Sequence, residues 1–281
     1  MNNSKNKLKP NNSDIDKLQE FLVSGIREYM KIGFTRIHLG LSGGIDSALA
    51  ACLAVKAAGP ENVTCLNMPS RFSSQGSRDD AAALAANLGC HYETIPIEEC
   101  YAALLSALKG IFRDLPFNTA EENIQTRIRG VLAMAYSNKF NSMLISASNK
   151  SEIAMGYCTL YGVDTIGVLA PIGGIFKSEV YALSRRINEV SIEGGGGEII
   201  PQVIIDKPPS AELRPDQKDE DSLPPYDVLD PILDLYLCEK MSAEEIISKG
   251  WDRDLVKGII KTVSWAEFKA RQLPPVLTPP R

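Results

Sequence analysis

The chain has 281 residues, of which 44% are hydrophobic and 23% charged, and its formal net charge is −5 at pH 7. These values fit a globular enzyme with a substantial core and exclude a mainly disordered chain. The acidic balance argues against general nucleic-acid binding, which requires a basic surface, whereas local basic clusters can still hold a small anion.

The six cysteines lack the spacing of a zinc site or a disulfide framework. We therefore expect small core thiols in a reducing compartment. They are Cys52, Cys65, Cys90, Cys100, Cys158 and Cys238. Residues Met1 to Ser13 are rich in Asn and Lys without the apolar centre of a signal peptide, and no apolar run is long enough to span a bilayer. These features predict a disordered segment at residues 1–13, a cytoplasmic location and no membrane partner.

Strand and helix patterns alternate over the first 150 residues. Apolar residues recur every three or four positions from Ile15 to Tyr29, which predicts an amphipathic opening helix. Short apolar strands are expected at 37–41, 63–68, 92–97 and 143–147, and helices at 48–58, 79–88 and 121–139. This alternation predicts an α/β fold with a parallel sheet, helices on both faces and ligands at the carboxyl ends of the strands.

The pattern weakens beyond Gly173, where one helix is expected at 177–187. The segment from Gly194 to Pro225 is rich in Gly, Pro and acidic residues, which are poor material for a packed core. We expect it to be largely loop, and a loop of this length is usually functional or mobile. Short helices and a Pro-rich tail follow. A single α/β domain is therefore expected over residues 14–281.

The strongest local signal is the run from Leu41 to Ser47, L-S-G-G-I-D-S, between the first strand and the next helix. Adjacent glycines let the backbone approach an anion, and serine hydroxyls and helix-start amides can cradle phosphate. Asp46 fits this site if it binds Mg²⁺ held by phosphates, because Mg²⁺ prefers one or two carboxylates plus phosphate oxygens. The alternative is a Gly-rich turn capped by serines.

The sequence S-G-G-x-D-S resembles the pyrophosphate-binding loop of the N-type ATP pyrophosphatases, which activate a carbonyl-type oxygen by adenylation. Later segments resemble those of the NAD synthetases within this superfamily. They are S-N-K-S-E at 148–152, G-Y-C-T-L-Y-G at 156–162, P-I-G-G-I-F-K at 171–177, E-N-I-Q-T-R-I-R at 122–129, P-S-A-E-L at 209–213 with Gln217, Asp219 and Glu220, and K-A-R-Q at 269–272. The resemblance covers nearly all of the chain after Ser13, and it implies an adenine nucleotide alpha hydrolase-like, Rossmann-like fold.

The resemblance also implies roles for individual residues. It makes Asp46, Glu152 and Lys177 catalytic, with Asp46 and Glu152 as ligands of Mg²⁺, a pairing that suits a hard cation bridging phosphates. The implied ATP-binding residues are Leu41, Ser42, Gly43, Gly44, Asp46, Ser47, Met68, Lys177 and Ser210. The implied substrate-binding residues are Asn123, Arg127, Arg129, Tyr157 and Asp164, and the planar fork of arginine suits phosphate.

For several of these residues, an ordinary structural role is the alternative. Glu152 alone fits a solvated acid at a helix start, Ser210 an ordinary loop serine, and one of the two arginines a solvated basic face. The family motif continues Tyr-Gly-Asp, whereas Val163 precedes Asp164 here. Ala147 stands where a Thr that contacts ATP is common. His38 and His91 match no catalytic position and are expected to be structural.

The function implied by the resemblance is amidation of deamido-NAD to NAD. The scheme consumes ATP, passes through an adenylated intermediate and releases AMP and pyrophosphate, and the enzyme is expected to be a homodimer. A tRNA-thiolating enzyme is one alternative, against which the missing C-x-x-C pairs and the acidic balance count. A non-catalytic nucleotide-binding protein with the same fold is the other.

The motifs at 123–130 and 223–226 resemble the synthetase half of glutamine-dependent enzymes more than the free-standing ammonia-dependent ones. An amidase of the nitrilase type needs its own Glu, Lys and Cys on a separate domain. None of the six cysteines lies in a segment that could form such a site. We therefore expect ammonia as the nitrogen donor, with a separate amidase as an alternative source.

Overall fold

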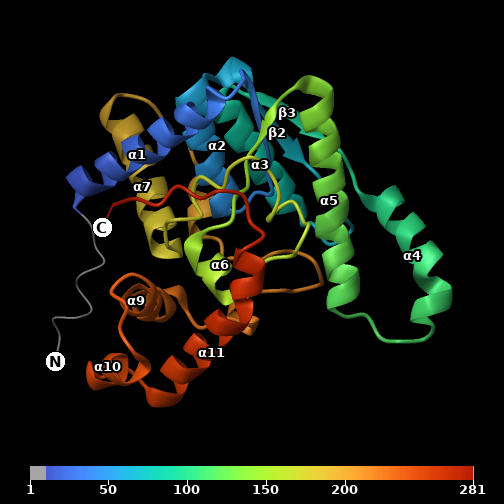
Figure 1. The fold of residues 1–281 in the computed structure, drawn as a ribbon. Helices are drawn as coiled ribbons and strands as arrows, with labels where there is room; N and C mark the ends of the chain where they lie inside the picture. Colours follow the sequence, from blue (N-terminus) through green and yellow to red (C-terminus); the bar gives the residue numbers. More distant parts are fainter. Residues whose placement is uncertain (1–10, 281) are drawn as a thin grey trace.

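The computed structural model describes residues 11–280 (Figure 1). Of the segment expected to be disordered, residues 1–13, residues 1–10 lie outside the described residues, whereas residues 12 and 13 are helical. Helix α1 (Asn12–Met30) begins earlier than expected, because the side chain of Asn11 accepts a hydrogen bond from the backbone amide of Asp14 and caps the helix. No helix among residues 11–280 is long and apolar enough to cross a membrane.

A four-stranded parallel sheet lies at the centre of the molecule, in the order β3-β2-β1-β4. The strands are β1 (Ile37–Gly40), β2 (Val63–Asn67), β3 (His91–Thr94) and β4 (Met143–Leu144). Strand β4 is shorter than expected, because the chain beyond it pairs elsewhere: Ile145 bridges Leu169, and Ala170 bridges Val276 of the C-terminal segment. The expected parallel α/β fold is confirmed.

Helices cover both faces of the sheet, as the apolar character of β1 and β2 requires. On one face, α1 joins α2 (Ile45–Ala58), α3 (Gln75–Leu88) and α7 (Lys177–Glu193) around the largest apolar cluster. On the other face lie α4 (Glu98–Phe112) and α5 (Thr119–Phe140). Helix α2 is buried nearly all round, because it lies between the sheet, α1 and α7.

A third apolar cluster joins α6 (Lys150–Met155) to the C-terminal helices, which lie together below the sheet in Figure 1. These are α9 (Tyr226–Leu237), α10 (Ala243–Ser248) and α11 (Arg253–Ala270). Short elements at Pro60–Asn62 (η1), Gln202–Asp206 (α8) and Asp219–Asp221 (η2) complete the structure. Helix α6 thus belongs to two regions, since it follows the sheet and packs on the C-terminal helices.

Three local expectations are corrected. Helix α4 was not expected from the sequence. Strand β3 is largely exposed rather than buried, because it forms the edge of the sheet. The first part of the expected loop, residues 194–206, packs on the core through Ile200, Ile204 and Ile205. The expectation that the six cysteines lie in the core is also corrected, because only Cys52 and Cys65 are buried, and Cys100 is exposed.

Candidate active site

A cavity of about 420 Å³ opens at the carboxyl ends of β1 and β2 and beside the segment that follows β4. Its position is that expected for a ligand site in a parallel α/β sheet. Every site residue expected from the sequence except Arg127 lines this cavity. The side chain of Arg127 is on the exposed surface of α5, where its Nε donates to the carbonyl of Leu160 at 3.2 Å.

The Gly-rich run forms a tight loop between β1 and α2. Gly43 has a φ of +83°, and a Cβ atom there would lie 2.2 Å from the carbonyl oxygen of Ser77, so only glycine fits. Ser47 Oγ donates to the carbonyl of Gly44 at 2.9 Å, and the amide of Gly44 donates to Ser42 Oγ at 3.2 Å. No side chain caps the N-terminus of α2, so its first amides point into the cavity as an anion cradle.

Three charged side chains from three different elements meet at the floor of the cavity. Lys177, which is 1% exposed at the start of α7, places its Nζ 2.5 Å from Asp46 Oδ2 and 3.1 Å from Glu152 Oε1. Asp46 lies in the first turn of α2 and Glu152 in the first turn of α6. Asn149 Nδ2 also donates to Asp46 Oδ1 at 2.8 Å, which fixes the carboxylate.

The electrostatics of this cluster are dominated by negative charge. Burial and, to a smaller extent, the charge of Asp46 raise the pKa of Glu152, Lys177 opposes both, and the resulting pKa is about 8. Burial alone would lower the pKa of Lys177, but the charges of Asp46 and Glu152 outweigh it and raise this pKa above its usual range. The ammonium is therefore firmly held, and the carboxylates still lack full compensation.

A third carboxylate, Asp219 of η2, adds to this imbalance. It is 4% exposed, its Oδ2 accepts a hydrogen bond from the Tyr226 hydroxyl at 3.1 Å, and its Oδ1 has no hydrogen-bond partner among the described residues. Burial raises the pKa of Asp219, and Lys177 opposes this. Three carboxylates, of which Asp219 is buried and Asp46 and Glu152 are partly buried, thus surround one ammonium. An orphaned carboxylate oxygen is a position that a bound cation or donor would satisfy.

A second group of polar residues lines the cavity between α5 and residues 157–164. The Thr159 amide donates to Asp164 Oδ2 at 2.6 Å, the Thr159 hydroxyl donates to Asn123 Oδ1 at 2.7 Å, and Arg129 Nε donates to the carbonyl of Met68 at 2.8 Å. Asp164 Oδ1 is buried without a partner, and burial raises the pKa of Asp164 to about 6. Despite the extra residue before it, Asp164 therefore faces the cavity with an unused acceptor.

Within residues 207–225, the cavity is lined by residues 207–213, Gln217 and Asp219, and the segment is anchored by charged side chains. Glu212 accepts hydrogen bonds from the Ser74 amide at 3.2 Å, the Ser74 hydroxyl at 2.9 Å and the Ser77 hydroxyl at 2.7 Å, all at the N-terminus of α3. Lys207 Nζ lies 2.5 Å from Asp80 Oδ2 and 3.1 Å from Ser77 Oγ. The hydroxyl of Ser210 lines the cavity and donates to the carbonyl of Gln217 within the same segment.

No role was expected for two lysines that line the cavity, Lys207 and Lys269. Lys269 Nζ donates to the carbonyls of Gly156 and Cys158 at 2.7 and 2.8 Å. Lys207 lies directly before the P-P-S-A-E-L run, and Lys269 begins the K-A-R-Q motif. The position of each lysine next to or within a family motif could therefore have predicted that both residues belong to the site.

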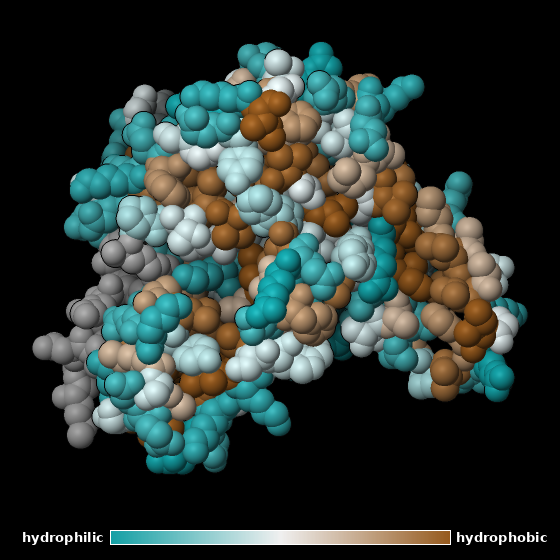
Figure 2. Space-filling view, in the orientation of Figure 1, coloured by the Kyte–Doolittle hydropathy of each residue, from teal (hydrophilic) through white to brown (hydrophobic). Residues whose placement is uncertain are grey.

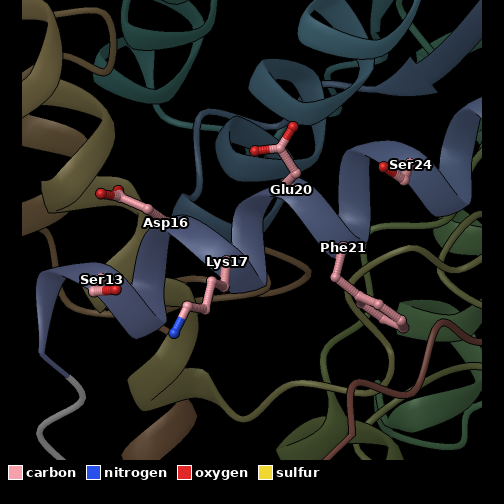
Figure 3. Close-up of a pocket in the computed structure, with 6 residues that line it drawn as sticks. All are labelled: Ser13, Asp16, Lys17, Glu20, Phe21 and Ser24. Atoms are coloured by element: carbon pink, nitrogen blue, oxygen red, sulfur yellow. The ribbon is translucent and has the colours of Figure 1, made fainter.

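A second hollow lies on the outer surface of α1 (Figure 3). Its lining residues are Ser13, Asp16, Lys17, Glu20, Phe21 and Ser24. All six come from one helix and point in different directions in Figure 3, and Asp16 is paired with Arg186 of α7. No convergent group of polar side chains forms there, in contrast to the cavity at the sheet.

Comparison with known proteins places this chain in a family. The model of the NAD synthase family matches residues 15–274. The glutamine-dependent NAD(+) synthetase of Synechocystis sp. is 50% identical over 265 residues, covering 94% of this chain and 46% of that protein. The chain spans about half the length of the curated relatives it matches.

Two solved structures of similar length resemble the fold. The NH3-dependent NAD synthetase of Campylobacter jejuni has a TM-score of 0.72 and 29% identity, covering 91% of this chain and 95% of that one. The NMN synthetase of Francisella tularensis has a TM-score of 0.75 and 27% identity, with the same coverage. The matched residues 15–274 include every residue that lines the cavity. The chain belongs to the NAD synthase family.

Proposed function

We propose that this protein catalyses the ATP-dependent amidation of deamido-NAD to NAD. The observation that carries the proposal is Lys177 held between Asp46 and Glu152, beside a glycine loop and a helix N-terminus suited to phosphate. The family membership and the polar group around Asp164 support it.

The reaction follows from two displacements at the cavity. The nicotinate carboxylate of deamido-NAD attacks the α-phosphorus of ATP, forming an O–P bond while the bond to pyrophosphate breaks. Ammonia then attacks the activated carbonyl carbon, AMP leaves, and a proton is lost from nitrogen. The amides of α2 and the ammonium of Lys177 stabilise charge on the phosphates, and the residues near Asp164 align the acceptor.

The carboxylates fit Mg²⁺ as a cofactor. Asp46 and Glu152 would hold the ion, because both are hard oxygen ligands in a buried cluster with excess negative charge. No group of three or more acidic, His or Cys side chains among residues 11–280 is arranged to hold a metal ion by itself, so phosphate oxygens of ATP would supply further ligands. When bound, the ion supplies charge neutralisation at the departing pyrophosphate.

We also propose that the protein is a homodimer formed through α4 and α5. Apolar side chains gather over these helices on the right of Figure 2. The exposed ones are Leu104, Ile111, Leu115, Phe117, Val131, Met134 and Phe140. Arg127 lies one turn before Val131 on α5, so a second copy on this face would also bring Arg127 into the interface.

The catalytic proposal is tested by measuring pyrophosphate release with Mg·ATP in the presence and absence of deamido-NAD. Release that depends on deamido-NAD and ammonium supports it. Nicotinic acid mononucleotide serves as the comparison substrate, because the fold is shared with an NMN synthetase. A preference for the mononucleotide, or no release with either compound, would refute the proposal.

The dimer is tested by sedimentation of the wild type and of Val131→Asp. Val131 is 70% exposed, and a carboxylate at this position would disfavour an apolar contact. The matched control is Ile32→Asp, which changes a residue that is 67% exposed after α1. We expect a dimer for the wild type and the control and a monomer for Val131→Asp. A wild-type monomer would exclude this interface.

A further inference from the structure

Asp230 is a buried carboxylate on α9. It does not line the cavity and forms no ion pair with a lysine or arginine among residues 11–280. Its Oδ1 accepts a hydrogen bond from the Ser151 hydroxyl at 2.6 Å, and its Oδ2 accepts one from the Ser178 amide at 2.8 Å. Ser151 Oγ in turn accepts the amide of Lys177 at 3.0 Å. Asp230 therefore links α9 to the first turns of both α6 and α7.

These contacts satisfy donors that α7 cannot satisfy itself. The first amides of a helix have no partner within the helix, and the N-cap residue of α7 is Phe176, which has no side-chain acceptor. Ser151 and Asp230 serve as the cap from outside, at the amides of Lys177 and Ser178. A carboxylate is also favoured at this end of the helix dipole.

This hydrogen-bond network matters because it holds the backbone next to Glu152 and at Lys177. Ser151 directly precedes Glu152, and the capped amide belongs to Lys177 itself. The two hydrogen bonds therefore fix the backbone from which Glu152 and Lys177 reach each other at 3.1 Å. Charged groups in an active site lose effect steeply when misplaced by about 1 Å.

We propose that Asp230 and Ser151 form a positioning pair that sets the placement of Glu152 relative to Lys177. The proposal rests on the function proposed above, since it assigns the pair to that reaction. Neither residue touches substrate in this scheme. Both act through the backbone of the two helices that carry the catalytic side chains.

The test compares Ser151→Ala, Asp230→Asn and the double variant by steady-state kinetics. Alanine removes the bridging hydroxyl, and asparagine offers one acceptor oxygen where two donors must be met. We expect kcat to fall roughly 10- to 100-fold in each single variant, with the KM for ATP kept within about twofold, because alignment and not binding is lost. The double variant should be no worse than the poorer single one.

Two further variants separate positioning from general stability. Ser151→Thr keeps the hydroxyl and should restore most of kcat. Ser184→Ala removes another fully buried hydroxyl of α7, which donates to the carbonyl of Val180 and has no link to α9, and should leave kcat unchanged. Equal losses in Ser151→Ala and Ser184→Ala, or a full kcat in Asp230→Asn, would overturn the proposal.

Hydrogen exchange gives a readout that does not depend on turnover. Ser151→Ala and Asp230→Asn should speed exchange at residues 176–179, while the later turns of α7 stay protected. Unchanged exchange at 176–179 in both variants would refute the pair. If the wild type released no pyrophosphate with deamido-NAD, the proposed function would fail, and the exchange result would still decide whether the pair orders these helix starts.

Discussion

Lys177 illustrates at the scale of one residue how this site is built. A buried ammonium is costly unless it is paired, and here two carboxylates from separate helices pair with it. Breaking such a group by removing one partner leaves uncompensated charge in the interior. The arrangement is therefore held in place by the fold.

We predict that Asp46→Asn and Glu152→Gln abolish most turnover and leave the fold intact. Each change removes a carboxylate that would hold Mg²⁺ beside Lys177, and we expect kcat to fall by about 10²- to 10³-fold. Pyrophosphate release and thermal melting measure the two effects. Glu20→Gln, which changes an exposed glutamate of α1, is the matched control (Figure 3). Near-normal activity of Asp46→Asn at limiting Mg²⁺ would show that the metal assignment is wrong.

His38 of β1 is structural and makes stability depend on pH. Its Nε2 donates to the carbonyl of Ala133 at 3.0 Å, so its Nδ1 accepts from the Ser142 hydroxyl at 2.9 Å. Burial lowers the pKa of His38 to about 4, although the bond to Ala133 opposes this. The neutral ring is therefore the form that fits the folded protein.

A group whose pKa is lower in the folded state than in the unfolded state stabilises above the unfolded value of about 6.5 and loses this contribution as pH falls to about 4. We predict that the free energy of unfolding drops by up to about 3 kcal/mol over this window because of His38. Urea unfolding at pH 7, 5.5 and 4 measures it. In His38→Gln the drop should be smaller by that amount, and an identical pH profile would contradict the assignment.

At the scale of elements, the segment expected to be one long loop has two parts. Residues 194–206 are tied to α7, where Asn188 bonds the backbone of Ile199 and Ile200. Residues 207–225 instead cover the cavity and are anchored by Glu212 at α3. Only the second part has the placement of a lid.

We predict that ATP with deamido-NAD protects residues 207–225 from protease, whereas residues 194–206 resist cleavage with or without ligand. Glu212→Gln weakens the anchor, because charge-assisted hydrogen bonds are stronger than neutral ones. We expect Glu212→Gln to raise the KM for ATP about tenfold and to affect kcat less. The variant should also increase cleavage of residues 207–225 in the absence of ligand. Glu220→Gln, an exposed change in the same segment, is the control. Equal cleavage with and without ligands would exclude closure.

At the scale of the whole molecule, the open question is the source of nitrogen. The first curated relatives are glutamine-dependent, and the chain matches about half of each. A solved structure that matches over nearly its full length is NH3-dependent. Of the six cysteines, Cys100 alone is exposed, and it lies in α4, away from the cavity.

We predict that this 281-residue chain forms NAD with ammonium salts and not with glutamine. Its rate should rise with pH as the free ammonia fraction increases, because the neutral amine is the nucleophile. NAD formation measured with each donor, after removal of contaminating ammonia, tests this. Addition of a separate amidase together with glutamine is the control that should restore the reaction. Efficient use of glutamine by the purified chain would overturn the prediction.

The sequence by itself determined the α/β class, the parallel sheet and most of the cavity lining. These follow from local signals: the alternation of strands and helices, and the glycine run at 41–47, where Gly43 needs a positive φ and space that no side chain leaves. Side chains that follow parallel strands must meet at one edge of the sheet. For this reason Asp46 and Glu152 could be placed together from the sequence.

Only the tertiary structure decided which distant groups complete the site. The sequence cannot show that Lys177 pairs with both Asp46 and Glu152. Nor can it show that Oδ1 of Asp219 has no hydrogen-bond partner among the described residues, or that Asp230 of α9 caps α7. Helix α4 was likewise not expected, and β3 was expected to be buried although it is an exposed edge strand. In each case the deciding interaction joins residues far apart in the chain, and packing of whole elements, not local pattern, sets it.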